Sequence, residues 1–178
     1  MDNTARAKLA AAVTPTRSLL FYTLTATIPI VVITMVLLFM KGTSHKNLAL
    51  LSILGAITGL VGLGRLLYEL TLDIAGFPTR TLPIWSVFYL IVYLVSGFSF
   101  LFFGYHMASP GKYFGGFENG PKPAFLDSLY LSLCNYIGVS PFGDISVKNQ
   151  GMRFATVIQG VVSMFINVVI ITKFVNTF

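Results

Sequence analysis

The stretch CNYIGVSPFGD, residues 134–144, places turn-forming residues inside a strongly apolar part of the chain. Two glycines, a serine and a proline interrupt the hydrophobic run, and Asp144 closes it. Proline lacks a backbone N–H and glycine is unfavourable in a helix interior, so a regular helix cannot continue through this segment. The stretch therefore predicts a turn, and the sequence on either side indicates where in the molecule that turn lies.

The composition around this turn is that of a membrane protein. The chain has 178 residues, of which 55% are hydrophobic and 10% charged, whereas soluble domains carry roughly 25% charged residues. Four apolar stretches come close to the roughly 20 residues that cross a bilayer. We expect transmembrane helices over residues 19–40, 48–68, 83–107 and 154–175. A signal peptide is the alternative for the first stretch, but its apolar region is longer than the about 7 to 15 residues of such peptides.

Several function classes find no support in the sequence. The chain has no run of Lys and Arg interleaved with aromatic residues, so we expect no nucleic acid partner. Its net charge of +6 suits the anionic headgroups of membrane lipids. Cys134 is the single cysteine, which excludes a disulfide within the chain. His45 and His106 lie near predicted span ends without a nearby second ligand or nucleophile in the sequence, so we interpret both as interfacial residues. We expect no enzyme, no cofactor and no metal site beyond permeant ions.

Three features inside the predicted spans indicate how the helices pack. Gly55 and Gly59 form a GxxxG pair, which lets another helix approach closely. Arg65 and Glu69 lie four residues apart and can pair on one helix face. Asn167, in the last span, is either an interhelical hydrogen-bonding group or a ligand in a cavity.

The segment 124–136, directly before the turn, is too short to cross a bilayer. It lies between two full spans, so the irregular backbone after it would sit at membrane depth, where only water or protein can satisfy its N–H and C=O groups. We therefore expect a re-entrant helix, with Asp127 in its first turn and the negative, cation-attracting end of its dipole inside the membrane. The alternative is a buried helix and turn in a bundle without an ion pathway.

The stretch FLDSLYLSLCNYIGVSPFGD, residues 125–144, resembles the pore helix and selectivity filter of the tetrameric potassium channel superfamily. The matching positions are Phe125, Asp127, Leu129, Tyr130 and Ser132 in the helix and Phe142, Gly143 and Asp144 at the end of the stretch. Residues 151–174 look like the inner helix that follows the filter in that family. The first two predicted spans lie outside the resemblance, which begins at about residue 82.

This resemblance implies an all-α membrane protein with four transmembrane helices per subunit and a re-entrant pore helix and filter loop between the third and the fourth. Residues 1–80 would comprise an N-terminal cytoplasmic segment and two transmembrane helices, and residues 81–178 the potassium-channel-like pore domain. Four copies would form a homotetramer in the cell membrane that conducts K⁺, with Na⁺ as a second permeant ion. Lys and Arg are evenly divided between the two sides, so orientation follows from the pore, with the filter loop outside and the N-terminus cytoplasmic.

The resemblance also assigns ion-binding residues. Backbone carbonyls of such a filter replace the hydration shell of the ion, and Asp144 would form an acidic ring at the outer mouth that raises the local cation concentration. The expected filter residues are Ile137, Gly138, Val139, Ser140, Phe142 and Gly143. The expected cavity-lining residues of the last span are Ser163, Ile166, Asn167 and Ile170.

The filter departs from the family pattern T-V-G-Y-G. Either Gly138 replaces the opening threonine and Pro141 is an extra residue, or residues 139–141 are inserted after Gly138. Proline fixes φ at about −65° and cannot take the left-handed conformation of a filter glycine, so four stacked carbonyl sites cannot form unchanged. We expect cation conduction with altered selectivity. The alternatives are a non-conducting structural or modulatory membrane subunit with a pore-like fold, and a channel for another ion.

Overall fold

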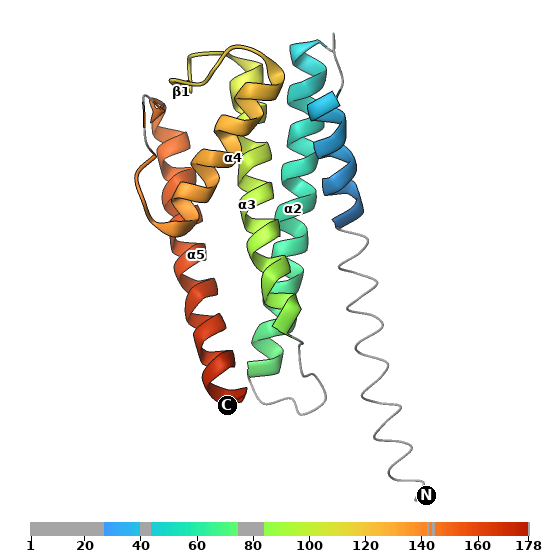
Figure 1. The fold of residues 1–178 in the computed structure, drawn as a ribbon, viewed down its shortest axis with the longest axis vertical. Coiled ribbons are helices and arrows are strands. Elements are labelled where there is room, and N and C mark those ends of the chain that lie inside the picture. Colours follow the sequence, from blue (N-terminus) through green and yellow to red (C-terminus); the bar gives the residue numbers. More distant parts are fainter. Residues whose placement is uncertain (1–26, 40–43, 75–83, 142, 144, 178) are drawn as a thin grey trace, which may run out of the picture.

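The computed structural model describes residues 27–39, 44–74, 84–141, 143 and 145–177. Its elements are a helix Thr27–Phe39, α2 (His45–Ile74), α3 (Ile84–Ala108), β1 (Phe114–Gly115), α4 (Pro121–Ile137), β2 (Ser146–Val147) and α5 (Gln150–Thr177). Figure 1 shows α3 in the centre, with α2 and the first helix on one side and α4 and α5 on the other. The described chain is a helical bundle, in agreement with the predicted all-α class.

Three of the described helices are long and apolar enough to cross a membrane. They cover His45–Glu69, Phe88–Ala108 and Gln150–Thr172, which correspond to the predicted spans 48–68, 83–107 and 154–175. The helix Thr27–Phe39 is shorter than a span; residues 19–26 and 40 of the first predicted span lie outside the described part of the chain.

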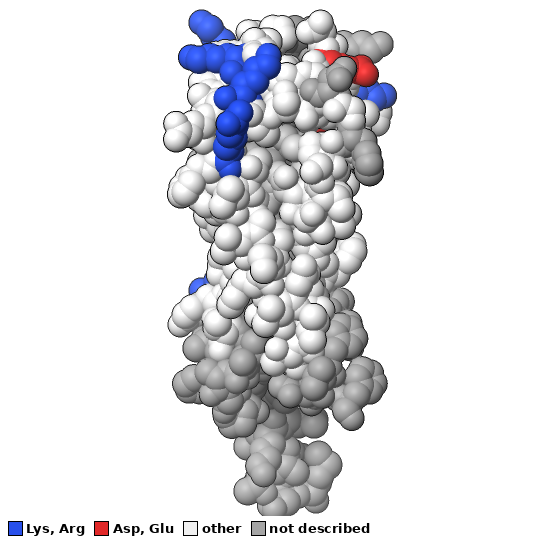
Figure 2. All heavy atoms as spheres, turned by 90° about the vertical axis from the view of Figure 1, so that its left-hand side faces the viewer, with Lys and Arg blue, Asp and Glu red and all other residues white. Residues whose placement is uncertain are grey.

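The positions of the charged side chains also agree with a membrane protein. Figure 2 shows the face that carries α4 and α5, where Lys and Arg gather at the end at which α5 begins and the middle is largely uncharged. Lys112, Lys148 and Arg153 are exposed at this end. An uncharged, apolar band beside a charged end suits the hydrocarbon core of a bilayer.

α2 and α3 pack closely because glycines lie where the helices meet. A Cβ atom on Gly59 would lie 2.9 Å from the Cα atom of Gly97, and one on Gly55 would lie 2.9 Å from the ring of Phe100. Such distances leave no room for any side chain at these two positions, and they allow the backbones to approach. The close packing predicted from the GxxxG pair is confirmed, and α3 is the partner helix. On the same helix, Arg65 and Glu69 form the predicted i,i+4 ion pair at 3.0 Å.

Gly59→Ala is expected to destabilise the protein, and Gly64→Ala is not. The added methyl group at Gly59 meets the backbone of Gly97, which cannot yield as a flexible side chain would, so the two helices must separate. We expect a loss of about 1–3 kcal/mol in the free energy of unfolding, as for other overpacked sites. Gly64 has no atom within 4 Å of a Cβ position, so alanine there should be neutral or stabilising by up to about 1 kcal/mol. Unfolding in detergent measures both; equal effects would contradict the close approach.

The loop between α3 and α4 is more regular than the sequence predicts. Glycines and prolines in residues 109–123 argue against regular structure, yet β1 pairs antiparallel with β2, with Phe114 opposite Val147. This pairing fixes the start of α5 beside the connection that follows α3. Both ends of the segment 116–145 therefore lie at the same end of the bundle, as Figure 1 shows.

α4 also begins earlier than the predicted segment 124–136. Its first residue is Pro121, after the N-cap Gly120, because prolines are tolerated in a first turn whose N–H groups have no acceptor within the helix. Asp127 therefore lies in the second turn, and the prediction that it lies in the first is wrong. Its carboxylate instead accepts a hydrogen bond from the backbone N–H of Glu118 at 2.7 Å, which ties the preceding loop to α4.

Candidate functional site

α4 ends partway along the two long helices beside it (Figure 1). The hydroxyl of Ser132, near the C-terminal end of α4, donates a hydrogen bond to the carbonyl oxygen of Val95 at 2.9 Å. Val95 lies near the middle of α3, about 20 Å from its C-terminal end at 1.5 Å per residue. The last turns of α4 therefore lie level with the middle of α3.

The helix stops at a glycine in a left-handed conformation. Gly138 has φ +79°, and its N–H and that of Val139 both donate to the carbonyl oxygen of Cys134, at 2.9 and 3.0 Å. This arrangement closes the last turn and reverses the chain, which then returns to β2. We call residues 121–147, α4 and its return, the α4 hairpin. The turn predicted from the opening stretch of sequence lies at its tip.

A buried polar network fixes α4 against both neighbours. The side-chain nitrogen of Gln159, on α5, donates to the carbonyl oxygen of Ser132 at 2.9 Å and to its hydroxyl oxygen at 2.7 Å. The side-chain oxygen of Gln159 accepts a hydrogen bond from the amide of Asn135 at 3.2 Å. Gln159 and Ser132 are fully buried. In apolar surroundings these bonds are strong and a broken one leaves an unsatisfied group, so the network favours one position of α4 along α5.

The tip of the α4 hairpin has a further contact with α5. The hydroxyl of Tyr136 donates to the side-chain oxygen of Asn167 at 3.0 Å. This interhelical hydrogen bond is the first of the two roles that the sequence leaves open for Asn167. Because Asn167 is past the midpoint of α5, the contact again places the end of α4 at the middle of the bundle.

A double-mutant cycle on this contact should show measurable coupling. We expect Tyr136→Phe and Asn167→Leu to have a coupling free energy of about 0.6 kcal/mol, and at most about 1.7 kcal/mol, as for other hydrogen bonds between membrane helices. The measurement is the free energy of unfolding in detergent of the wild type, the two single variants and the double variant. Strictly additive effects would show that the two side chains do not interact.

The expected filter residues lie at the tip and on the return of the α4 hairpin. Those that are exposed in the single chain are Ile137, Gly138, Val139, Ser140 and Gly143. Pro141 is half-buried, whereas Phe142 and Asp144 lie outside the described residues. Gly143, like the glycine that caps α4, has a positive φ, of +89°, which is a conformation that favours glycine.

Two of the expected cavity-lining residues lie inside the single chain. Ser163 is 2% exposed and Ile166 is 0% exposed, and the hydroxyl of Ser163 donates to the carbonyl oxygen of Gln159 on its own helix. Ile170 is half-buried, and Asn167 is exposed. Ser163 and Ile166 therefore pack against the other helices of the chain, and their expected place in a cavity does not agree with the structure.

The opposite face of α5 is apolar and exposed. Its large side chains are Phe154, Val157, Ile158, Val161, Met164, Phe165, Val168 and Ile171. A continuous apolar face of this kind suits lipid or another protein chain rather than water.

We compared the chain with protein-family models, with curated proteins and with solved structures. None of them matches it. Function is therefore inferred from the α4 hairpin and its contacts.

Sequence reasoning missed the role of Gln159 and Asn135. The signal that could have found Gln159 is an amide inside an apolar helix, which usually hydrogen-bonds to another helix. The sequence does not say which helix that is, because the partner Ser132 lies on a segment of different length and direction. In the sequence, Ser132 was identified only as one of the positions that match the potassium channel pattern.

Proposed function

We propose that the chain is the subunit of a homotetrameric channel that conducts monovalent cations, with K⁺ as the main permeant ion and Na⁺ as a second. One observation carries the proposal. α4 ends at the middle of the long helices, is held there by buried hydrogen bonds, and is followed by an exposed turn that contains glycine. If the long helices cross a bilayer, this turn lies at membrane depth and α4 is a re-entrant helix.

Backbone groups at that depth need polar partners. Lipid offers none, so the backbone of residues 138–141 and 143 would face water, ions or another protein chain. The C-terminal end of α4, with the negative end of its helix dipole, points toward the same region. A surface formed by carbonyl oxygens at a negative helix end favours cations over anions.

The exposed apolar surface of the single chain is compatible with assembly in a membrane. Ile137 is 67% exposed and Val139 is 44% exposed, although both lie beside a turn that would be inside the membrane. Lipid or another copy of the chain would cover these side chains and the exposed face of α5, whereas the backbone of the turn beside them needs polar partners. In the proposal, four copies meet so that their α4 hairpins surround one axis, as the resemblance to potassium channels implies.

The remaining assignments follow from this arrangement. Each subunit would have four transmembrane helices in the cell membrane, with the filter loop and Asp144 outside and the N-terminus cytoplasmic. The filter would run from Ile137 to Gly143. Of the polar residues on α5, Asn167 would lie nearest the inner end of the filter, because it is exposed and contacts Tyr136. Pro141 predicts weaker separation of K⁺ from Na⁺ than four stacked carbonyl sites provide.

Ion flux from liposomes that contain this chain alone tests the proposal. We expect K⁺ efflux above that of empty liposomes, Na⁺ flux of the same order or smaller, and no Cl⁻ flux, together with a tetramer on crosslinking in detergent. Flux of Cl⁻ without cations would make the protein a channel for another ion. An inserted, folded protein without any flux would contradict conduction and support the alternative, a non-conducting structural or modulatory subunit.

A further inference from the structure

The chain has two histidines, and both line one hollow of about 470 Å³. His45 is the first residue of α2, and His106 and Met107 belong to the last turn of α3. Asn119, two prolines and a glycine complete the wall. The sequence predicts that each histidine is an interfacial residue, and the structure adds that both lie at the same hollow.

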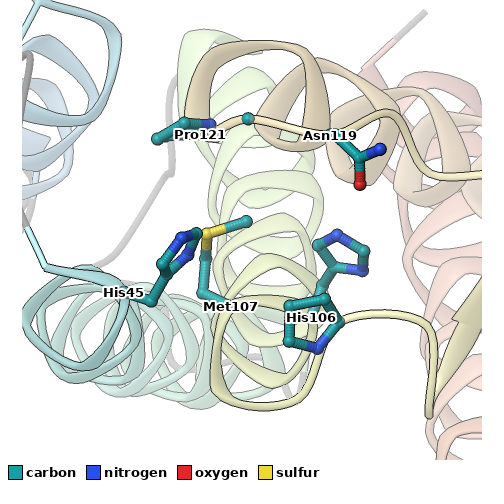
Figure 3. Close-up of a pocket in the computed structure, with 7 residues that line it drawn as sticks. His45, His106, Met107, Asn119 and Pro121 are labelled. Carbon is teal, nitrogen blue, oxygen red and sulfur yellow. The ribbon is translucent and has the colours of Figure 1, made fainter.

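Figure 3 shows the arrangement of these side chains. His45 and Met107 lie beside each other on one side, His106 lies farther along the same wall, and the side-chain oxygen of Asn119 points toward His106. The hollow therefore presents two imidazoles, a thioether and an amide, supplied by α2, by α3 and by the loop before α4. No acidic side chain is among the described residues that line it.

His106 is buried, and one of its two ring nitrogens has no hydrogen bond within the described part of the chain. Its side chain is 3% exposed, its ring packs on that of Phe117 with centroids 5.0 Å apart, and its buried Nδ1 atom has no hydrogen-bond partner among the described residues. An unsatisfied buried polar group is unfavourable and is unusual in native proteins. A half-turn of the ring about the Cβ–Cγ bond places Nδ1 where Cδ2 now lies and Nε2 where Cε1 now lies, so the edge of the ring that carries Nδ1 can be reversed.

We propose that this hollow binds a transition-metal cation such as Zn²⁺, Ni²⁺ or Cu²⁺ through His45 and His106. Imidazole nitrogens are common ligands of these metals, and the thioether of Met107 and the amide of Asn119 are further neutral donors in reach of the same space. Mg²⁺ and Ca²⁺ prefer sets of oxygen ligands that include carboxylates, and the described lining of the hollow contains none. A bound ion would connect the start of α2 to the end of α3, next to the loop that leads into α4.

Calorimetric titration of the full chain tests the site. The protein is purified in detergent through a tag without histidine, stripped with a chelator, and titrated with each of the three metals and with Mg²⁺ and Ca²⁺. We expect one Zn²⁺ per chain and no heat from Mg²⁺ or Ca²⁺. At Zn²⁺ 100-fold above the dissociation constant, the melting temperature should rise by about 5 °C or more. The measurement needs no ion flux, so it is independent of the proposed conduction.

Two variants locate the binding. His45→Ala changes an exposed residue, so it should fold normally and bind Zn²⁺ at least about tenfold more weakly; His106→Ala should do the same. Lys46→Ala, next to His45 but not lining the hollow, should bind as the wild type does. The imidazole signals of the two histidines should also shift together in NMR spectra as Zn²⁺ is added. No metal binding, equal binding of Ca²⁺, or unchanged affinity in His45→Ala would overturn the proposal.

Discussion

Replacing Gly143 by alanine should lower cation flux at least about tenfold and leave the subunit folded. The φ of Gly143 is +89°, and a Cβ atom there would meet no atom within 4 Å, so the substitution strains the backbone without a clash. A residue other than glycine costs about 1–2 kcal/mol in this left-handed backbone conformation. A free-energy difference of about 1.4 kcal/mol corresponds to a tenfold change in a rate. The turn relieves the strain by shifting, which in the proposed filter moves carbonyl oxygens away from the ion path. Flux of K⁺ from liposomes measures the effect.

Gly111→Ala is the matched control for this variant. Gly111 also has a positive φ, of +75°, and also has no atom within 4 Å of a Cβ position, but it lies in the loop after α3 and outside the α4 hairpin. The conformational cost is therefore similar, and flux should stay at the wild-type level. A similar loss in both variants would indicate general destabilisation, and no loss in either would show that the return of the α4 hairpin does not line an ion pathway.

The long helices could be predicted because hydropathy alone sets them. A helix that crosses a bilayer needs a long apolar run, and such runs are visible in any sequence, so the predictions for 48–68, 83–107 and 154–175 agree with α2, α3 and α5. The GxxxG pair predicted which residues of α2 lie in the α2–α3 contact. Its partner Gly97 could not be identified, because a single glycine carries no information about which helix lies against it.

The sequence predicts the short helix and the turn of the α4 hairpin, but not the contacts that hold them in the bundle. The short helix and its turn follow from local residues, whereas the contacts that hold them depend on distant ones. Apolar residues occupy both the buried and the exposed face of α5. Spacing therefore placed Ser163 and Ile166 on one face but did not indicate that this face is turned toward the chain's own helices. The meeting of His45 with His106 likewise depends on the antiparallel packing of α2 and α3, which no local pattern specifies.

Gln159→Leu should lower the stability of the protein and its ion flux together. Leucine is similar in size but lacks the amide, so two hydrogen bonds to Ser132 are lost and the amide of Asn135 loses its acceptor inside the bundle. Leaving such a group unsatisfied costs about 1–3 kcal/mol. We expect a fall of this size in the free energy of unfolding in detergent. We also expect lower K⁺ flux, because α4 loses the contact that sets its position along α5.

Thr172→Val is the control on the same helix. The hydroxyl of Thr172 donates to the carbonyl oxygen of Val168 on α5 itself, at 2.9 Å, so its removal breaks no contact with α4 and should change stability by less than about 0.5 kcal/mol. A Gln159→Leu protein that keeps its stability but loses flux would mean that the amide positions the α4 hairpin without holding the bundle together. If Gln159→Leu changes neither quantity more than Thr172→Val does, the end of α4 is not fixed at the middle of the bundle, and conduction through its tip loses its physical basis.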